Sequence, residues 1–229
     1  GFFGSATTIS ATLEQGKPLS EAIGEVKGAA AFLLWYAEEA SRGYGGWIPP
    51  SNKSKRLLVI PKPIGVVGAI TPWNFPSSMI TRKIAPALAA GCTVVLKPAP
   101  ETPLSAIEIM KILQRAGLPD GVVNLVTGDA EEIGKAMLEN KDVRLITFTG
   151  STAVGKYLMQ ESAKHVKKLS LELGGHAPSI VFEDADIEKA ATLVLGSKFR
   201  NKGQTCICTN RLYVHESIAE AVTTKLAEK

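Results

Sequence analysis

The chain has 229 residues, enough for one large domain or two modest ones, and 45% hydrophobic with 21% charged residues is typical of a protein with a hydrophobic core. The net charge of +4 is spread along the sequence, and its densest basic stretch, residues 164–168, is too short to indicate a nucleic-acid partner. No apolar run approaches the roughly 20 residues that a membrane span requires, so no membrane partner is expected either.

The first predicted element is a long amphipathic helix over residues 19–40, in which apolar side chains from Ile23 to Ala37 recur at helical spacing. Glycines at 43, 45 and 46 and prolines at 49 and 50 end it. Four short runs rich in β-branched residues follow, at residues 64–70, 93–96, 122–126 and 145–148. Such runs are typical of strands that are buried on both faces of a parallel sheet.

Helical patterns lie between these strands, at residues 77–90, 102–116 and 130–138. In the second of them, Thr102 is predicted as the capping residue and Pro103 as the first helical residue. The regular alternation predicts an α/β fold with a doubly wound parallel sheet, whose ligands bind beyond the carboxyl ends of the strands.

After Gly175 the pattern starts again, with a strand at 179–182, a helix at 187–199, a strand at 212–214 and a helix at 217–229. The sequence therefore predicts two domains, residues 1–173 and residues 174–229. The second is expected to be the beginning of a further α/β domain.

A glycine-containing loop, GSTAVGK at residues 150–156, follows the strand at 145–148 and opens a helix. The free backbone amides of a first helical turn bind anions, so Gly150 and Ser151 are predicted to bind a pyrophosphate. The spacing also matches the phosphate-binding loop of nucleoside triphosphatases, but Tyr157 stands where a serine or threonine must reach magnesium. A turn that only starts a helix is the remaining alternative.

Three peptides carry groups that suit chemistry at a carbonyl: PWNFP at residues 72–76, LELGG at 171–175 and GQTC at 203–206. Cys206 is the candidate nucleophile, because a thiolate attacks an aldehyde readily and the thiohemiacetal can expel hydride to leave a thioester. The side-chain amide of Asn74, with the backbone N–H of Cys206, would stabilise the oxyanion. Glu172, between two leucines, is expected to have its pKa raised by an apolar setting and to act as general base in hydrolysis. The structural alternatives are a buried apolar cysteine, a turn asparagine and a buried ion pair.

Two further cysteines have different expected fates. Cys208, two residues from Cys206, is either half of a redox switch, in which a strained and readily reduced disulfide blocks the nucleophile, or a spectator thiol. Cys92 is expected to pack in the core. Three cysteines are too few for a disulfide scaffold and favour a reducing compartment, by default the cytoplasm.

Together with KFRN at residues 198–201, which leads into GQTCIC at 203–208, these peptides resemble the aldehyde dehydrogenase superfamily, and most closely its succinate-semialdehyde dehydrogenase branch. The resemblance runs from about Leu13 to the last residue. It implies that residues 1–173 form the dinucleotide-binding domain and that residues 174–229 begin the catalytic domain. It also implies that the chain, with its abrupt start GFFG at residues 1–4, is a fragment of an enzyme that assembles as a homodimer or homotetramer.

The coenzyme implied by the resemblance is NADP or NAD. The implied cofactor-binding residues are Pro72, Trp73, Lys97, Pro100, Gly128, Gly150 and Ser151, with a core aromatic as the alternative for Trp73. Relatives that prefer NAD carry a glutamate three residues after this lysine, and Pro100 stands there, with Glu101 one place later. The missing carboxylate removes the main penalty on a 2′-phosphate, so NADP is expected to be accepted.

The substrate implied by the resemblance is an aldehyde with a distal carboxylate, succinate semialdehyde, which would be oxidised to succinate. Arg82 and Arg200 match positions that hold this carboxylate in the branch, and surface or helix-capping arginines are the alternative. Glutarate semialdehyde, transfer of the acyl group to coenzyme A and a truncated, inactive nucleotide-binding fragment are the competing hypotheses. The three histidines have no metal-ligand spacing, so no metal is expected.

Overall fold

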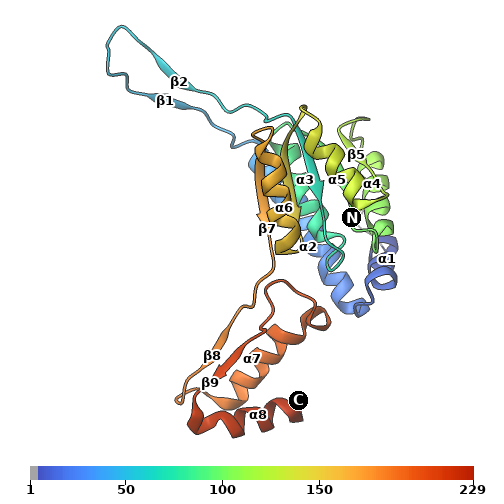
Figure 1. Cartoon of the computed structure of the whole chain (residues 1–229), viewed down its shortest axis with the longest axis vertical. Helices are drawn as coiled ribbons and strands as arrows, with labels where there is room; N and C mark the ends of the chain where they lie inside the picture. The colour runs from blue at the N-terminus through green and yellow to red at the C-terminus, as the bar shows by residue number, and fades with distance from the viewer. Residues whose placement is uncertain (1–4) are drawn as a thin grey trace. The chain divides into compact units, whose positions relative to one another are not determined.

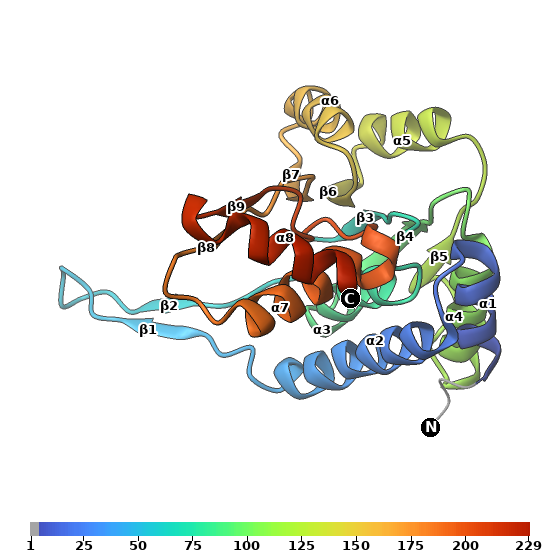
Figure 2. The ribbon, with the colours of Figure 1, turned by 90° about the horizontal axis from the view of Figure 1, so that it is seen from below.

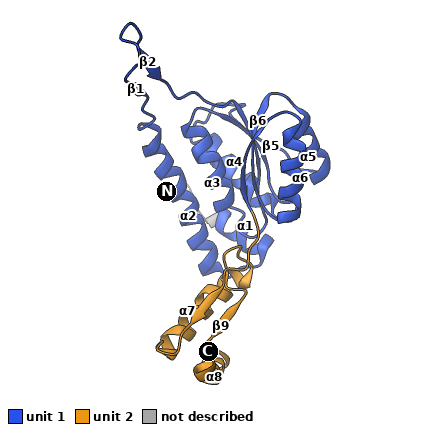
Figure 3. Cartoon of the chain, turned by 60° about the vertical axis from the view of Figure 1, so that its left-hand side comes forward, with its two compact units in different colours: residues 1–172 blue, residues 173–229 orange. Residues whose placement is uncertain are grey.

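A computed structural model describes residues 5–229, in which the chain divides between Glu172 and Leu173 into two compact units (Figure 3). The division lies one residue before the boundary that the sequence predicts. The start of the expected first domain, GFFG at residues 1–4, lies outside the described residues. In the described part of the chain, no helix is long and apolar enough to cross a membrane.

The first unit is built on a five-stranded parallel sheet with the strand order β5-β4-β3-β6-β7. Its strands are β3 (Val66–Ile70), β4 (Thr93–Lys97), β5 (Val123–Leu125), β6 (Val143–Thr149) and β7 (Lys168–Glu172). The chain fills one half of the sheet with β3, β4 and β5, and then crosses to the other side of β3 to add β6 and β7. The predicted doubly wound parallel sheet is therefore confirmed, and its topological switch point lies between β3 and β6.

Helices cover both faces of this sheet (Figure 2). The helices α1 (Ser5–Gln15), α2 (Leu19–Ala40), α3 (Ser78–Ala89) and α4 (Pro103–Arg115) lie on one side, and α5 (Ala130–Glu139) and α6 (Thr152–Ala163) lie on the other. The buried core lies chiefly between β3, β4, α3 and α4, where Val94, Leu96, Ile80, Ile84 and Ile109 are fully enclosed. Cys92 belongs to this core, as predicted.

Helix α1 and the hairpin over residues 46–59 of the first unit do not follow from the sequence pattern. Helix α1 has no strong apolar stripe, because it packs through small buried residues such as Thr7 and Ala11. The antiparallel hairpin of β1 (Gly46–Ile48) and β2 (Leu57–Val59) has strands of three residues, too short to show a periodicity. It projects away from the sheet, with all six strand residues exposed (Figure 1).

The predicted start of α4 is confirmed, but the capping hydrogen bonds come from another helix. Thr102 occupies the N-cap position and Pro103 the first turn, but the Thr102 side chain makes no capping hydrogen bond. The carboxylate of Glu14, from α1, caps the helix instead: it accepts from the backbone N–H of Leu104, from the N–H of Ser105 (3.0 Å) and from the Ser105 hydroxyl (2.7 Å). A carboxylate offers two oxygens and a charge that the helix dipole favours.

The second unit is a small β-α-β arrangement. Strands β8 (Ser179–Val181) and β9 (Leu212–Val214) pair in parallel, and α7 (Ile187–Phe199) connects them through a 3-10 helix (Arg200–Gly203) and the loop that carries Cys206. A short 3-10 turn (Glu216–Ile218) and α8 (Ala219–Glu228) follow. The predicted strands and helices of this region are confirmed, with small shifts of their ends.

Candidate active site

A pocket of about 800 Å³ lies beyond the carboxyl ends of β3, β4 and β6, next to the switch point of the sheet. Its walls come from the loops after these strands, from the first turn of α6 and from one face of α5. The pocket brings together six of the predicted cofactor-binding residues: Pro72, Trp73, Lys97, Pro100, Gly150 and Ser151. The core alternative for Trp73 is wrong, because its side chain is 39% exposed and lines the pocket.

Gly128, the seventh predicted residue, does not line this pocket. It has a φ of +145°, a backbone conformation that favours glycine, and it stands just before Asp129, which caps α5. Ala130, Glu131 and Gly134 of α5 form the wall on this side. Gly128 therefore shapes the turn into α5, and its contact with a coenzyme stays a prediction.

The glycine loop leads directly from β6 into α6. The Ser151 hydroxyl caps α6 by accepting from the Val154 N–H at 3.3 Å, and both Ala153 and Val154 line the pocket. The first turn of this helix consequently adjoins the pocket, where the positive end of the helix dipole would favour an anion. Gly150 has a packing reason as well, since a Cβ there would lie 2.4 Å from the buried ring of Phe148.

Lys97 ends β4 and is only 5% exposed. Burial lowers the pKa of its ammonium group, against the carboxylates of Glu101 and Asp129, which raise it. Pro100 and Glu101 both line the pocket, so a carboxylate is present one residue after Pro100, the position at which relatives that prefer NAD are expected to carry a glutamate.

Two hydroxyl groups in this pocket were missed by the sequence reasoning. Thr71 and Thr149 follow and end β3 and β6, respectively, and both line the pocket. Their Oγ1 atoms are buried, and neither has a hydrogen-bond partner among residues 5–229. An unpaired buried hydroxyl costs free energy that a polar ligand recovers, so these groups fit a hydrogen-bonding coenzyme. No pattern in a single sequence marks them.

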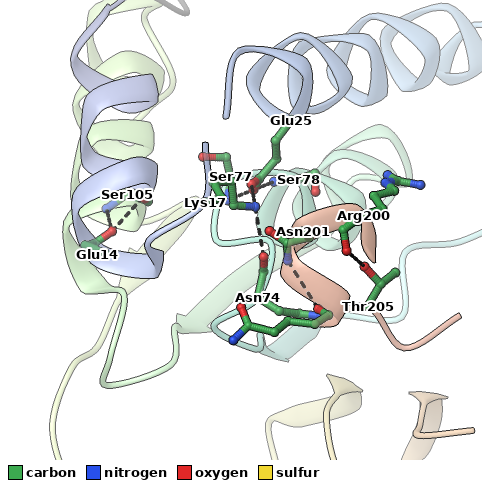
Figure 4. Close-up of polar contacts among 11 residues, drawn as sticks. Glu14, Lys17, Glu25, Asn74, Ser77, Ser78, Ser105, Arg200, Asn201 and Thr205 are labelled. Carbon is green, nitrogen blue, oxygen red and sulfur yellow. Dashed lines mark hydrogen bonds and ion pairs between the residues drawn. The ribbon is translucent and has the colours of Figure 1, made fainter. Parts of the chain in front are cut away.

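Asn74 lies on the loop after β3, half-buried, and its side-chain amide extends away from Lys17, whose ammonium group binds the Asn74 carbonyl oxygen at 2.9 Å (Figure 4). The Asn74 carbonyl group is thus held in place by Lys17. The oxyanion role of Asn74 remains a prediction.

Glu172 and Arg82 form an ion pair with 2.8 Å between Oε1 and Nη2. Both side chains are more than one third exposed, and both line a second cavity of about 520 Å³. The apolar setting expected for Glu172 is therefore wrong: β7 is an edge strand, and its last residue faces a guanidinium group. Arg82 does bind a carboxylate here, but it is the carboxylate of Glu172.

The same cavity contains a buried lysine that the sequence reasoning missed. Lys83 lies on the core-facing side of α3, 6% exposed, and its Nζ donates to Thr147 Oγ1 at 3.2 Å. Burial lowers its pKa to about 8, with Glu172 raising it and Arg82 lowering it. The available signal was a lysine next to Ile84, on the apolar stripe of a predicted helix.

This buried lysine predicts a specific pH dependence of stability. The folded-state pKa of about 8 lies below the ordinary value of 10.5, so between these pH values the unfolded chain binds more protons than the folded one. Stability contributed through Lys83 should therefore rise with pH across this window, by an amount on the order of 3 kcal/mol. Urea unfolding of the wild type and of Lys83→Met at several pH values measures it. A wild-type-to-variant difference that does not change with pH would contradict the prediction.

The second unit presents Cys206 in an exposed turn after the 3-10 helix. This turn is held by local hydrogen bonds, from Thr205 Oγ1 to the Arg200 carbonyl (3.3 Å) and from Asn201 Nδ2 to the Gln204 carbonyl (3.3 Å), drawn in Figure 4. The buried alternative for Cys206 is wrong. Cys208 is buried, with 2% of its surface exposed, and its thiol donates a hydrogen bond to the Gly203 carbonyl oxygen, 3.2 Å from Sγ.

The predicted site residues are divided between the two units. Asn74, Arg82 and Glu172 lie in the first unit, and Arg200 and Cys206 lie in the second. Their convergence around one carbonyl carbon stays a prediction, as does the redox role of Cys208, which is a free thiol. Among residues 5–229, no group of three or more His, Cys, Asp or Glu side chains could hold a metal ion.

Comparisons with known proteins agree with this architecture. Over 217 residues the chain is 57% identical to the succinate-semialdehyde dehydrogenase [NADP(+)] of Escherichia coli, covering 95% of this chain and 45% of that protein. It is 57% identical over 216 residues to the glutarate-semialdehyde dehydrogenase of Pseudomonas putida, covering 94% and 45%. A 3-sulfolactaldehyde dehydrogenase of Pseudomonas putida is 56% identical over 216 residues, covering 94% of this chain and 44% of that protein.

Solved structures match equally well. A crystal structure of an E. coli NADP-dependent enzyme superposes with a TM-score of 0.95 at 56% identity, covering 97% of this chain and 46% of that one. Betaine aldehyde dehydrogenase from Staphylococcus aureus, in complex with NAD+, superposes with a TM-score of 0.94 at 35% identity, covering 97% and 45%. The chain thus spans less than half the length of these relatives. A sequence model of the aldehyde dehydrogenase family matches residues 7–229, and the chain belongs to this family.

Proposed function

We propose that the protein containing this chain oxidises a carboxylate-bearing aldehyde, succinate semialdehyde, to the acid with NADP or NAD as the oxidant. The observation that carries the proposal is the pocket at the switch point of the sheet, where a helix N-terminus, a buried lysine and two unpaired hydroxyls adjoin one 800 Å³ space. Two of the relatives support this choice of coenzyme: the E. coli succinate-semialdehyde dehydrogenase is named for NADP(+), and the S. aureus betaine aldehyde dehydrogenase structure is a complex with NAD+.

The reaction assigns one role to each side chain. The Cys206 thiolate adds to the aldehyde carbon, Asn74 donates to the resulting oxyanion, and the thiohemiacetal loses hydride to form a thioester. When bound, the nicotinamide supplies the acceptor for that hydride. Glu172 then takes a proton from water, whose oxygen attacks the thioester carbon and releases the acid and the thiol. One aldehyde, one water and one oxidised coenzyme thus give one carboxylate, one reduced coenzyme and two protons.

The substrate is proposed from the arginines and from the relatives. Succinate semialdehyde, glutarate semialdehyde and sulfolactaldehyde, which appear in the names of the relatives, all carry an anionic group away from the aldehyde. Arg82 shows that it can hold a carboxylate, since it already pairs with Glu172. Glutarate semialdehyde is the second candidate, because a relative of equal identity is named for it.

The test is a panel of aldehydes against the full-length protein that contains this chain. Arg82→Ala and Arg200→Ala should each lower kcat/KM for succinate semialdehyde by about tenfold to a hundredfold, with much smaller effects on an uncharged aldehyde of equal length. The exposed, helix-surface variant Lys111→Ala is the matched control, because it removes a cation that pairs with Glu108 in its own helix. Equal losses for charged and uncharged aldehydes would show that the arginines do not bind the substrate carboxylate.

We propose that the protein accepts NADP and that Lys97 lies near its 2′-phosphate. Lys97→Met should raise KM for NADP by about tenfold or more and KM for NAD less, because only NADP loses a charge-assisted hydrogen bond to phosphate. Initial rates with both coenzymes measure this. Equal changes in both KM values would assign Lys97 to the ribose or to packing.

We also propose that the full protein assembles as a homodimer or homotetramer through the β1–β2 hairpin. Trp47 and Leu58 on its strands are each more than 60% exposed, and an isolated two-stranded hairpin is marginally stable by itself. Light scattering of the full protein and of its Leu58→Asp variant tests this, because an unchanged mass of the variant would show that the hairpin does not form the subunit interface.

The competing proposal is that the expressed chain acts only as a nucleotide-binding fragment. Binding of NADP by this chain without turnover of any aldehyde would support it.

A further inference from the structure

The turn between α1 and α2 contains a lysine that is almost completely buried. Lys17 is 1% exposed, and its ammonium group forms an ion pair with the carboxylate of Glu25, on α2, which is 7% exposed. Buried ion pairs contribute little net stability, and apolar replacements of similar volume are often neutral or stabilising. The pair therefore invites a role other than holding the fold together.

Both members of the pair bind the loop that carries Asn74 (Figure 4). Lys17 Nζ donates to the Asn74 carbonyl oxygen at 2.9 Å and lies 4.3 Å from the centre of the Phe75 ring. Glu25 Oε1 accepts from the backbone N–H groups of Ser77 at 2.7 Å and Ser78 at 3.1 Å. The two charges thus fix the loop at both ends, one through a carbonyl and the other through two amides.

Glu25 also replaces a missing local cap. Ser77 stands at the N-cap position of α3, but its side chain makes no capping hydrogen bond. The Glu25 carboxylate satisfies the first amides of α3 from outside, so the start of this helix is tied to α2. The loop from β3 to α3 consequently has little freedom to rotate the Asn74 peptide.

We propose that Lys17 and Glu25 are positioning residues for the Asn74 amide. They hold the Asn74 backbone so that its side chain presents the N–H group at a fixed place for the developing oxyanion. A donor displaced by about 1 Å loses much of its effect, on the order of a hundredfold in rate. This inference rests on the function proposed above, and it concerns only the loop geometry of the first unit.

The experiment separates oxyanion chemistry from thiol reactivity in the full-length protein. Lys17→Met and Glu25→Gln should each slow acylation of Cys206 by p-nitrophenyl acetate and the first turnover of aldehyde by about tenfold to a hundredfold. Alkylation of the same thiol by iodoacetamide forms no oxyanion, so its rate should stay within about twofold of wild type. KM for NADP should stay within about twofold as well, because neither Lys17 nor Glu25 lines the coenzyme pocket.

The matched control is Glu14→Gln. Glu14 makes the same kind of contact, a carboxylate from one helix that caps another, but it caps α4 and not the Asn74 loop. This variant should lower the melting temperature while leaving both acylation and alkylation rates within about twofold of wild type. The comparison shows whether a lost helix cap alone explains the effect.

The outcomes are distinct. Acylation at the wild-type rate in both variants, or equal losses of acylation and alkylation, overturns the positioning role. If Lys17→Met leaves Glu25 unpaired and prevents folding, the double variant Lys17→Met/Glu25→Gln, which buries no charge, decides by the same rates. A wild type that oxidises no aldehyde rejects the proposed function, whereas an active wild type with an impaired Asn74→Ala and intact Lys17 and Glu25 variants rejects only this inference.

Discussion

Replacing Cys206 with serine is expected to reduce aldehyde oxidation by about a thousandfold or more, while binding of NADP is retained. A serine hydroxyl is a far weaker nucleophile at neutral pH than a thiol. Reduced coenzyme formation by the full-length protein measures the loss. Quenching of tryptophan fluorescence by NADP, with Trp73 in the pocket wall, measures the binding.

Cys208→Ala provides the control for this variant. Its thiol is buried and donates to the Gly203 carbonyl, so its removal should preserve activity to within a few-fold and should abolish any peroxide sensitivity that dithiothreitol reverses. Unchanged peroxide sensitivity would make Cys208 a spectator. Substantial oxidation by Cys206→Ser would place the nucleophile elsewhere and refute the covalent scheme.

Four of the five strands of the sheet could be predicted because helices cover the sheet on both faces (Figure 2). Strands of a buried parallel sheet have short sequences rich in β-branched residues. The structure confirms β3, β4, β5 and β6 within a few residues of their predicted ends. The strand ends then indicated the pocket, since ligands of such sheets bind at the switch point. The coenzyme residues were implied by the family resemblance, and six of the seven line this pocket.

The polar contacts could not be predicted, because they join residues far apart in the sequence. Glu14 caps a helix 91 residues away, Lys83 contacts a threonine 64 residues away, and Lys17 contacts Asn74 across 57 residues. A single sequence shows each of these as an ordinary charged residue on a helix or in a turn. The prediction of an apolar setting for Glu172 was wrong for the same reason, because neighbouring leucines in a strand do not reveal an arginine on the adjacent helix.

Replacing Glu172 with glutamine is expected to separate the two halves of the reaction. Formation of the thioester requires the thiol and the oxyanion donor, whereas its hydrolysis requires a base for water. The variant should therefore release about one equivalent of reduced coenzyme per thiol in a rapid burst, followed by steady-state turnover slowed by roughly a hundredfold to ten-thousandfold. Stopped-flow absorbance of the reduced coenzyme in the full-length protein records both phases.

The ion pair with Arg82 supplies the control for this experiment. In Arg82→Ala the carboxylate of Glu172 loses its partner but is still present to take a proton from water, so hydrolysis of an uncharged substrate should continue while the Glu172→Gln variant stalls. Hydroxylamine or coenzyme A, added to the stalled enzyme, should restore turnover because each attacks the thioester without help from the carboxylate. Loss of the burst together with steady-state turnover would instead assign Glu172 to the first step. The half-exposed position of this carboxylate, open to water at the end of an edge strand, favours the second.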